Sequence, residues 1–369
     1  MKEKRKERNS SLELLRIIGM FMIISQHYVF HGGFDDDVFL SAAPNVTYLR
    51  IISMFGYAAC SFFVLISGYY LIHADTGKGF YRRLIPLIAE QLFYSLTTCA
   101  FILISGIVPM SLKEILKCFF PFFYGNWFVV FYILLYLFIP YLNRFLLSLD
   151  KTAYRKMLLL VFIMFSVIPT FFGDIYKPGD LGFMFQTYLF GAYYGLYKED
   201  FQYPNRYNLI FGLSCFIFII ASVFVMNGLG SLLNNVKFIK YNYFLMGSYS
   251  IPSFLFTLFI FMYASNKEFV NRGINLVAST LMGVYIIHDG NLRRVIWKII
   301  SPNVNYVESP YLHSILKILA VFAACVVIDL IRQMTLGKWV KRCVNKYFDR
   351  VTDRLASLVP KRIRGFFGK

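Results

Sequence analysis

The chain has 369 residues, of which 58% are hydrophobic, 19% aromatic and only 16% charged. This composition excludes an ordinary water-soluble domain and indicates a polytopic membrane protein. The net charge of +18 is consistent with basic loops beside a membrane and requires no nucleic-acid partner. The six cysteines lack paired spacing, so we expect neither a disulfide framework nor a metal site built from them.

Apolar runs of about 17 to 25 residues, long enough to cross a bilayer, recur along the chain. We expect ten spans, near residues 12–30, 51–72, 84–108, 127–147, 157–172, 181–197, 207–226, 243–264, 280–300 and 312–331. Arg16 interrupts the first run and no clean cleavage site follows, so we expect this span to remain in the mature protein. The sequence thus predicts an all-α transmembrane bundle over residues 1–334.

Lys and Arg residues are concentrated in alternate loops, which indicates the cytoplasmic side. With a cytoplasmic N-terminus, the segments on that side hold 5, 3, 4, 2, 2 and 10 of them, 26 together, whereas the outer loops hold six. We therefore predict that both termini are cytoplasmic. Residues 335–369 repeat apolar residues at helical spacing among basic ones, which is typical of an amphipathic helix on anionic membrane lipid.

The first span contains four ionisable residues, Glu13, Arg16, His27 and His31. A charge in hydrocarbon costs several kcal/mol, so this stripe must face protein, water or a partner. Arg16 and His27 are 11 residues apart, which places them on nearly one helix face and about 16 Å apart along the axis. A structural alternative is that Glu13 pairs with Arg16 while His27 only packs. Glu13 could orient Arg16 or cap the helix, and we favour the cap.

The ninth span, "VYIIHDGNLRR", carries a second intramembrane histidine, His288, which favours a functional role for His27. Asp289 precedes Arg293 by one helical turn, so we interpret these two residues as a structural salt bridge. Glu90, in the third span, is isolated and is a weaker candidate partner for a histidine or an arginine.

Five segments together resemble the acyltransferase-3 family of membrane-bound O-acyltransferases. They are "SLELLRIIGMFMIISQHY", "SFFVLISGYYLI", "YRRLIP", "NWFVVFYILLYLFIPYLN" and "VYIIHD", between about residues 10 and 335. The resemblance implies a multi-pass protein of the bacterial cell membrane with ten or slightly more spans. It also implies transfer of an acyl group, most often acetyl, from cytoplasmic acyl-coenzyme A to a hydroxyl of an extracytoplasmic glycan or lipid-linked sugar.

The resemblance also implies roles for individual residues. The family's arginine and histidine, separated by ten residues, match Arg16 and His27; the histidine is essential for transfer and the arginine belongs to the donor site. Two arginines three apart at the start of the third span are only partly matched by the adjacent Arg82 and Arg83. We assign His27, Arg16 and His288 as catalytic candidates.

The chemistry of coenzyme A indicates where its donor site should lie. Its phosphates need fixed cations, and Arg16, Arg82 and Arg83 suit them because guanidinium binds phosphate bidentately. His27 could accept a proton from the attacking hydroxyl and return it to the leaving thiolate, or it could carry the acyl group as an acyl-imidazole. Both routes remain open at this stage.

Three residues that enter the fourth span from outside, Asn126, Trp127 and Tyr132, suit a sugar acceptor. An interfacial aromatic belt explains Trp127 equally well. No permanently bound cofactor or metal is expected, because acyl-coenzyme A is a donor substrate. The expected partners are this donor, the glycan or lipid-linked acceptor and membrane lipids, while the oligomeric state, a homo-oligomer included, is left open.

A polysaccharide or lipid-linked sugar transporter is the alternative from another functional class, because it would also have many spans with buried charges. The absence of an inverted repeat in the sequence argues against it. A membrane glycosyltransferase is a second alternative, for which the acidic residues 35–37 are the only candidate motif.

Overall fold

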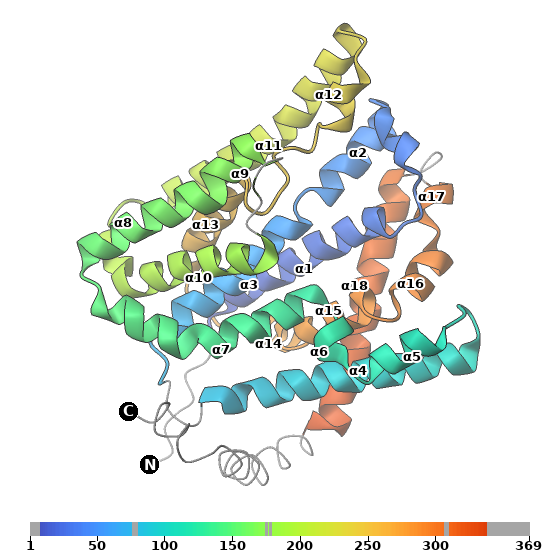
Figure 1. The fold of residues 1–369 in the computed structure, drawn as a ribbon, viewed down its shortest axis with the longest axis horizontal. Helices are drawn as coiled ribbons and strands as arrows, with labels where there is room; N and C mark the ends of the chain where they lie inside the picture. The colour runs from blue at the N-terminus through green and yellow to red at the C-terminus, as the bar shows by residue number, and fades with distance from the viewer. Residues whose placement is uncertain (1–7, 76–79, 174–175, 177–178, 306–309, 338–369) are drawn as a thin grey trace.

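The computed structural model describes residues 8–75, 80–173, 176, 179–305 and 310–337. Within these ranges the protein is an all-helical bundle without strands (Figure 1), as the sequence predicts. The amphipathic helix predicted for residues 335–369 falls almost entirely outside the described residues, so it remains a prediction.

The helices follow one another with short connections. The α-helices are α1 Ser10–Phe30, α2 Pro44–Ser53, α3 Gly56–Leu71, α4 Leu84–Ser105, α5 Leu112–Cys118, α6 Pro121–Tyr124, α7 Trp127–Ser148, α8 Lys151–Phe162, α9 Ile168–Phe172, α10 Gly179–Tyr197, α11 Arg206–Leu232, α12 Val236–Lys240, α13 Ile251–Ser265, α14 Arg272–Ala278, α15 Leu281–Asp289, α16 Arg293–Ile300, α17 Pro302–Asn305 and α18 Pro310–Thr335. Short 3₁₀ helices (η) lie at Asp36–Leu40, Phe80–Arg83 and Lys198–Asp200, and a π-helical turn connects α8 to α9 at Ile163–Val167.

Seven helical segments of the described chain are long and apolar enough to cross a membrane. They are Ser10–Phe30, Pro44–Leu71, Phe80–Ser105, Trp127–Ser148, Lys151–Phe172, Arg206–Leu232 and Pro310–Thr335. Three predicted spans are not among the seven. The span 181–197 lies within the helix α10, the span 243–264 is helical in α13 only from Ile251, and the span 280–300 is divided between α15 and α16. The count of ten spans therefore remains a prediction.

The prediction of one continuous helix over residues 280–300 is wrong, because α15 ends at Asp289 and α16 begins at Arg293. Gly290 follows α15 with a non-helical ψ of −144°, which ends the helical path. The side chain of Asn291 then donates hydrogen bonds to the Ser95 carbonyl at 2.9 Å and to Thr98 Oγ1 at 3.1 Å. These bonds hold the break against α4.

Helix α1 runs through the middle of the bundle, with α8 and α11 at one edge and α4 and α5 at the opposite edge (Figure 1). It packs against α2, α3, α13, α14, α15 and α18, so its apolar side chains are buried on several sides. Its N-cap is Asn9, whose side chain accepts a hydrogen bond from the Ser11 backbone. Our preference for Glu13 as a cap was therefore wrong: it accepts a hydrogen bond from Arg16 at 3.2 Å instead.

A close contact fixes α15 on α18. A Cβ atom at Gly283 would overlap the carboxylate of Asp329, so only glycine lets the two helices approach this closely. Asp329 is fully buried and is held by side chains of α4 and α18. Because α15 also carries His288 and Asp289, this contact sets the position of both residues.

Candidate active site

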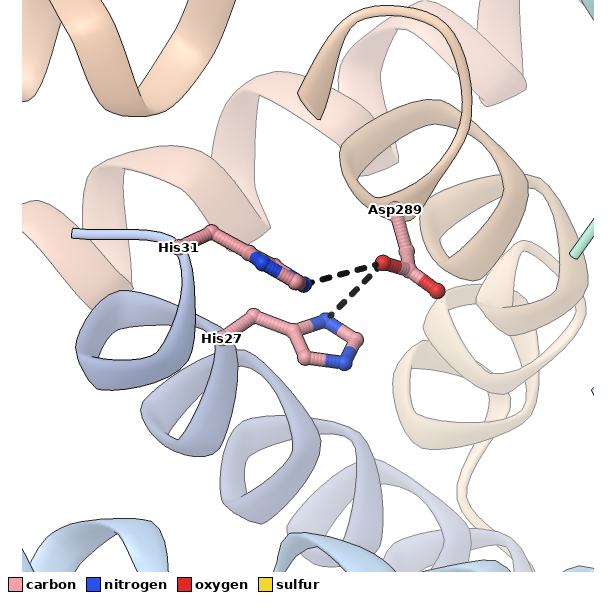
Figure 2. A group of neighbouring side chains, drawn as sticks. All are labelled: His27, His31 and Asp289. Atoms are coloured by element: carbon pink, nitrogen blue, oxygen red, sulfur yellow. Dashed lines mark ion pairs between the residues drawn. The ribbon is translucent and has the colours of Figure 1, made fainter. Parts of the chain in front are cut away.

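The C-terminal ends of α1 and α15 bring together His27 and His31 with Asp289 (Figure 2), and His288 lies beside His27. In Figure 2 both rings of the α1 histidines point toward the carboxylate of Asp289. The cluster is largely shielded, because His27, His288 and Asp289 expose only 7%, 0% and 8% of their surface. The two histidines that the sequence placed in separate spans are therefore neighbours.

The hydrogen bonds of the two buried rings define where their protons lie. His288 Nδ1 is 2.6 Å from the Val284 carbonyl, which can only accept, so Nδ1 carries a proton. In the neutral ring His288 Nε2 must then accept, and it lies 3.0 Å from His27 Nδ1, which donates. The remaining nitrogen of neutral His27, Nε2, therefore carries a lone pair that can accept a proton.

Asp289 Oδ1 is surrounded by three nitrogen atoms. His31 Nε2 lies at 3.5 Å, while His27 Nδ1 and Arg293 Nη1 each lie at 3.7 Å. The predicted pairing of Asp289 with Arg293 is thus present, but the interpretation of Asp289 as purely structural was incomplete. A carboxylate next to His27 stabilises the imidazolium that forms when this ring accepts a proton.

Two amides orient the carboxylate from the opposite side. Asn126 Nδ2 donates to Asp289 Oδ2 at 3.3 Å, and Gln91 Nε2 donates to Asn126 Oδ1 at 3.4 Å. All three side chains are buried. The arrangement leaves His27 as a base with a fixed tautomer and an oriented counter-charge, which is the geometry of general acid–base catalysis.

A cavity of about 190 Å³ leads toward the cluster from the N-terminal end of α1. Arg8 and Arg16 line one part of it, and Ile23 and Tyr285 line another. Ile23 is one helical turn before His27, and the Tyr285 ring lies 5.9 Å from the His288 ring. The predicted stripe between Arg16 and His27 therefore borders a cavity along part of its length.

A second cavity, of about 410 Å³, reaches the cluster from the other side. Asp289 lines it together with Asn126, Trp127 and Arg293. Two of the three predicted acceptor residues, Asn126 and Trp127, thus meet beside the candidate base. The third, Tyr132, does not line this cavity, and its hydroxyl lies 3.0 Å from Ser67 Oγ on α3.

The predicted donor arginines do not share one cavity. Arg16 lines the smaller cavity, where its guanidinium lies 3.2 Å from Glu13 and 5.4 Å from the centre of the Phe63 ring. Arg82 and Arg83 lie in the η segment before α4 and line neither cavity. Arg83 instead lies over the ring of Phe80, at 5.8 Å.

The sequence placed His31 on the stripe of α1, four residues after His27, but we assigned it no role in the site. Gln91 was not among the candidate residues, because its role depends on the contact between α4 and the start of α7.

His27, His31 and Asp289 each offer one potential metal ligand, and these atoms lie within 4.8 Å of one another. Histidine nitrogen with carboxylate oxygen is a donor set that divalent transition metals accept. However, the permanent charge of Arg293 lies beside the same carboxylate oxygen, and His27 Nδ1 already has His288 as its partner. These contacts favour an acid–base cluster over a metal centre.

The fold and the site define a multi-pass membrane protein with a buried histidine–aspartate cluster between two cavities. A family model described as an acyltransferase domain, that of the acyltransferase-3 family, matches residues 9–330. The chain therefore belongs to the acyltransferase-3 family and is a membrane acyltransferase, which confirms the resemblance seen in its sequence. Neither the curated proteins nor the solved structures include a significant match to it.

Proposed function

We propose that this protein transfers an acyl group, most often acetyl, from cytoplasmic acyl-coenzyme A to a hydroxyl of an extracytoplasmic glycan or lipid-linked sugar. The observation that best supports the proposal is the position of His27, His288 and Asp289 between two cavities of different chemistry. One cavity has arginines at one end and apolar walls, and the other is lined by amide, indole and charged groups.

The smaller cavity suits the donor. Arg8 and Arg16 can bind phosphate groups bidentately, and the apolar walls beyond them suit the thin pantetheine arm. The thioester would then reach Ile23 and Tyr285, next to the two buried histidines. Arg82 and Arg83 lie on the same predicted side of the membrane, and we keep them in the proposal as further contacts for the donor phosphates.

The reaction follows from the free nitrogen of His27. The acceptor hydroxyl gives its proton to His27 Nε2 while its oxygen attacks the thioester carbon; the carbon–sulfur bond then breaks, and the imidazolium returns the proton to the thiolate. Asp289 stabilises the imidazolium in between. If an acyl-imidazole forms instead, the same Nε2 atom is the nucleophile.

The 410 Å³ cavity suits the acceptor, because its volume lies in the usual range for small-molecule sites. Asn126 and Trp127 offer an amide and an aromatic surface to a sugar ring. The sugar hydroxyl would approach His27 past Asp289, which lines the same cavity.

Mass spectrometry of surface glycans from cells with and without the gene tests the proposal directly. Proteoliposomes supplied with labelled acetyl-coenzyme A provide the matching measurement in vitro. We expect an added acyl mass, and label in the glycan, only with the active protein. Altered glycan export without a change in acyl mass would contradict the proposal and support the transporter alternative.

The proposal also requires both termini to be cytoplasmic, so that the donor site faces coenzyme A. Cysteine introduced at Asp36 should react with an impermeant reagent from outside, whereas cysteine introduced at Lys346 should not. A cysteine-free background is needed, because the chain has six cysteines of its own. The reverse accessibility would refute this topology.

A further inference from the structure

A third cavity, of about 600 Å³, adjoins the cluster on the side of His31. It is lined by His31, Arg293, Arg294, Trp297 and Lys298, together with the two glycines after His31 and residues at the start of α17. Three cationic side chains line it, and no carboxylate of the described residues does. It shares Arg293 and Arg294 with the 410 Å³ cavity, so the two cavities meet beside Asp289.

The break after α15 creates this cationic wall. Helix α16 buries Val295 and Trp297 and exposes Arg293, Arg294 and Lys298. In a continuous ninth span these three cations would have faced the membrane interior. Adding them to the six basic residues of the outer loops gives nine, although Lys and Arg are normally retained on the cytoplasmic side. Topology therefore does not account for this concentration of charge.

The donors of this cavity are only partly used within the protein. Arg294 pairs with Glu114 at 2.9 Å, and Lys298 Nζ donates to the Ile107 carbonyl at 3.1 Å. Arg293 approaches Asp289 no closer than 3.7 Å. The Trp297 side chain is buried, and its Nε1–H has no hydrogen-bond partner among the described residues. A buried donor without a partner is costly, and an acceptor atom in the cavity that Trp297 lines would offset this cost.

We propose that this cavity binds an anionic group of the acceptor, a phosphate or a carboxylate, and so selects an anionic glycan or a sugar linked to a lipid phosphate. The inference rests on the proposed function, since it specifies the acceptor of the same active site. The anion is held by Lys298, Arg294 and Trp297, while the neutral sugar part extends into the 410 Å³ cavity. Its hydroxyl then meets His27 next to Asp289.

Binding to the purified full-length protein tests the inference with two pairs of probes. One pair is a short polyprenyl phosphate and the corresponding polyprenol, and the other is a hexuronate oligosaccharide and its neutral hexose counterpart. We expect at least one anionic probe to bind about tenfold or more tightly than its neutral counterpart, as a charge-assisted contact implies. The pair that shows the difference identifies the source of the anion. Equal binding within both pairs would overturn the inference.

Substitutions locate the binding. Lys298→Gln and Arg294→Gln should each raise the Kd of the anionic probe about tenfold. Trp297→Phe, which keeps an aromatic ring but removes the N–H donor, should also raise this Kd. Lys113→Gln is the matched control, because this residue is also basic and exposed but lines none of the three cavities. Unchanged binding in Lys298→Gln and Arg294→Gln, with unchanged melting temperatures, would refute the assignment.

Acyl transfer separates this inference from the proposed function. If the wild-type protein incorporates label from acetyl-coenzyme A, and the Arg294→Gln/Lys298→Gln double variant has an unchanged KM for the acceptor, the inference fails while the proposed function stands. If the wild-type protein incorporates no label, the proposed function fails, whatever the binding result. A raised KM with little change in kcat supports an anion contact remote from the reacting atoms.

Discussion

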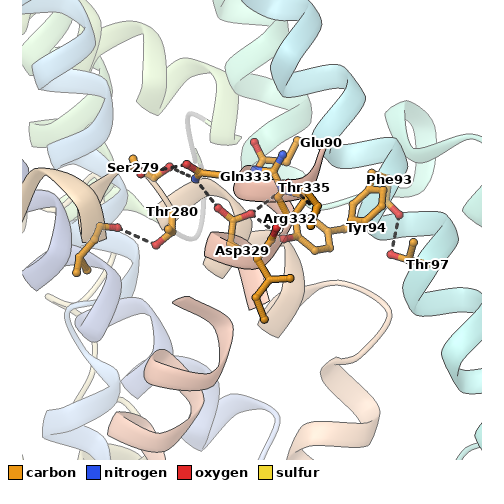
Figure 3. A network of polar contacts seen from close by, with 12 residues as sticks. Glu90, Phe93, Tyr94, Thr97, Ser279, Thr280, Asp329, Arg332, Gln333 and Thr335 are labelled. Atoms are coloured by element: carbon orange, nitrogen blue, oxygen red, sulfur yellow. Dashed lines mark hydrogen bonds and ion pairs between the residues drawn. The ribbon is translucent and has the colours of Figure 1, made fainter. Parts of the chain in front are cut away.

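Two buried charged clusters lie in this bundle, and their contacts differ in kind. In the first (Figure 3), Asp329 accepts from Tyr94 at 2.6 Å, from Arg332 Nε at 2.7 Å and from Gln333 at 2.7 Å. Arg332 also donates to Glu90 at 2.8 Å, so Glu90, which the sequence offered only as a weak candidate, does pair with an arginine. Every charged group of this cluster has a short, direct partner.

In the second cluster (Figure 2), Asp289 Oδ1 has three nitrogen neighbours, all between 3.5 and 3.7 Å. The other oxygen of this carboxylate, Oδ2, accepts a hydrogen bond from Asn126 at 3.3 Å. Asp289 itself lines the 410 Å³ cavity. Tyr94 and Arg332 of the first cluster also line a cavity, of about 310 Å³, but the Asp329 carboxylate does not line it.

The comparison shows that a buried charge is not in itself a sign of catalysis. A cluster with saturated short contacts has no capacity left for a substrate, and it serves to fix α4, α15 and α18 against one another. A cluster whose carboxylate has longer contacts and lines a cavity can tighten around a reacting group, as catalytic hydrogen bonds do when substrate is bound. We therefore expect substitutions in the two clusters to have opposite effects on stability and activity.

The largest effect should come from His27→Ala. A general base contributes about 10²- to 10⁴-fold to rate, so acyl transfer should fall by at least that factor. His73→Ala is a suitable control, because His73 is exposed and its only hydrogen bond in the described structure is the one that its Nε2–H donates to the Gly195 carbonyl. Label incorporation per mole of inserted protein measures both. Near wild-type transfer in His27→Ala would show that this cluster is packing, like that around Asp329.

Asp329→Asn should destabilise the protein without a specific effect on the reaction. It leaves Arg332 with one carboxylate partner instead of two, and breaking a buried ion pair costs about 3 kcal/mol or more. The melting temperature in detergent should fall clearly. Asp289→Asn is the matched variant, for which we expect a small change in melting temperature and a large loss of kcat. The opposite pattern would reverse the roles assigned to the two clusters.

The sequence predicted the helical class and the stripe on α1 because both follow from local periodicity. Arg16 and His27 occupy the same helix, so their separation and shared face are determined by helix geometry alone. The sequence also identified His288, since an intramembrane histidine is conspicuous in an apolar run. Its hydrogen bond to His27 was not predictable, because it joins residues 261 positions apart.

The break at Gly290 was missed for a related reason. Residues 280–300 are apolar enough to suggest one span, and only the side chain of Asn291, bound to α4, shows why the helix stops. Tyr132 was assigned to the acceptor site because it enters the fourth span from the outer side and its phenol group suits a sugar. Helix α7 directs it toward Ser67 instead, a contact that depends on the packing of α7 against α3.

A smaller effect is expected at the donor end. Arg16→Ala should raise the KM for acyl-coenzyme A about tenfold, because a phosphate contact far from the reacting atoms acts on ground and transition states alike. Arg16→Lys should restore little of the affinity if the contact is bidentate. Arg82→Ala and Arg83→Ala should show weaker increases in KM, since neither residue lines the cavity. Unchanged KM values in all three alanine variants would place the donor elsewhere.

Removal of metal ions should have the smallest effect. His27, His31 and Asp289 could in principle hold a divalent ion, but a bound cation would lie beside Arg293 and would compete with the His27–His288 hydrogen bond. The Arg293 guanidinium would repel the metal ion, and the hydrogen bond to His288 occupies the His27 nitrogen that would be a ligand. Acyl transfer should therefore persist after dialysis against EDTA, and added zinc should not raise it. Loss of activity in EDTA that zinc restores, together with loss of bound zinc in His31→Ala, would mean that the longer contacts around Asp289 mark an empty metal centre.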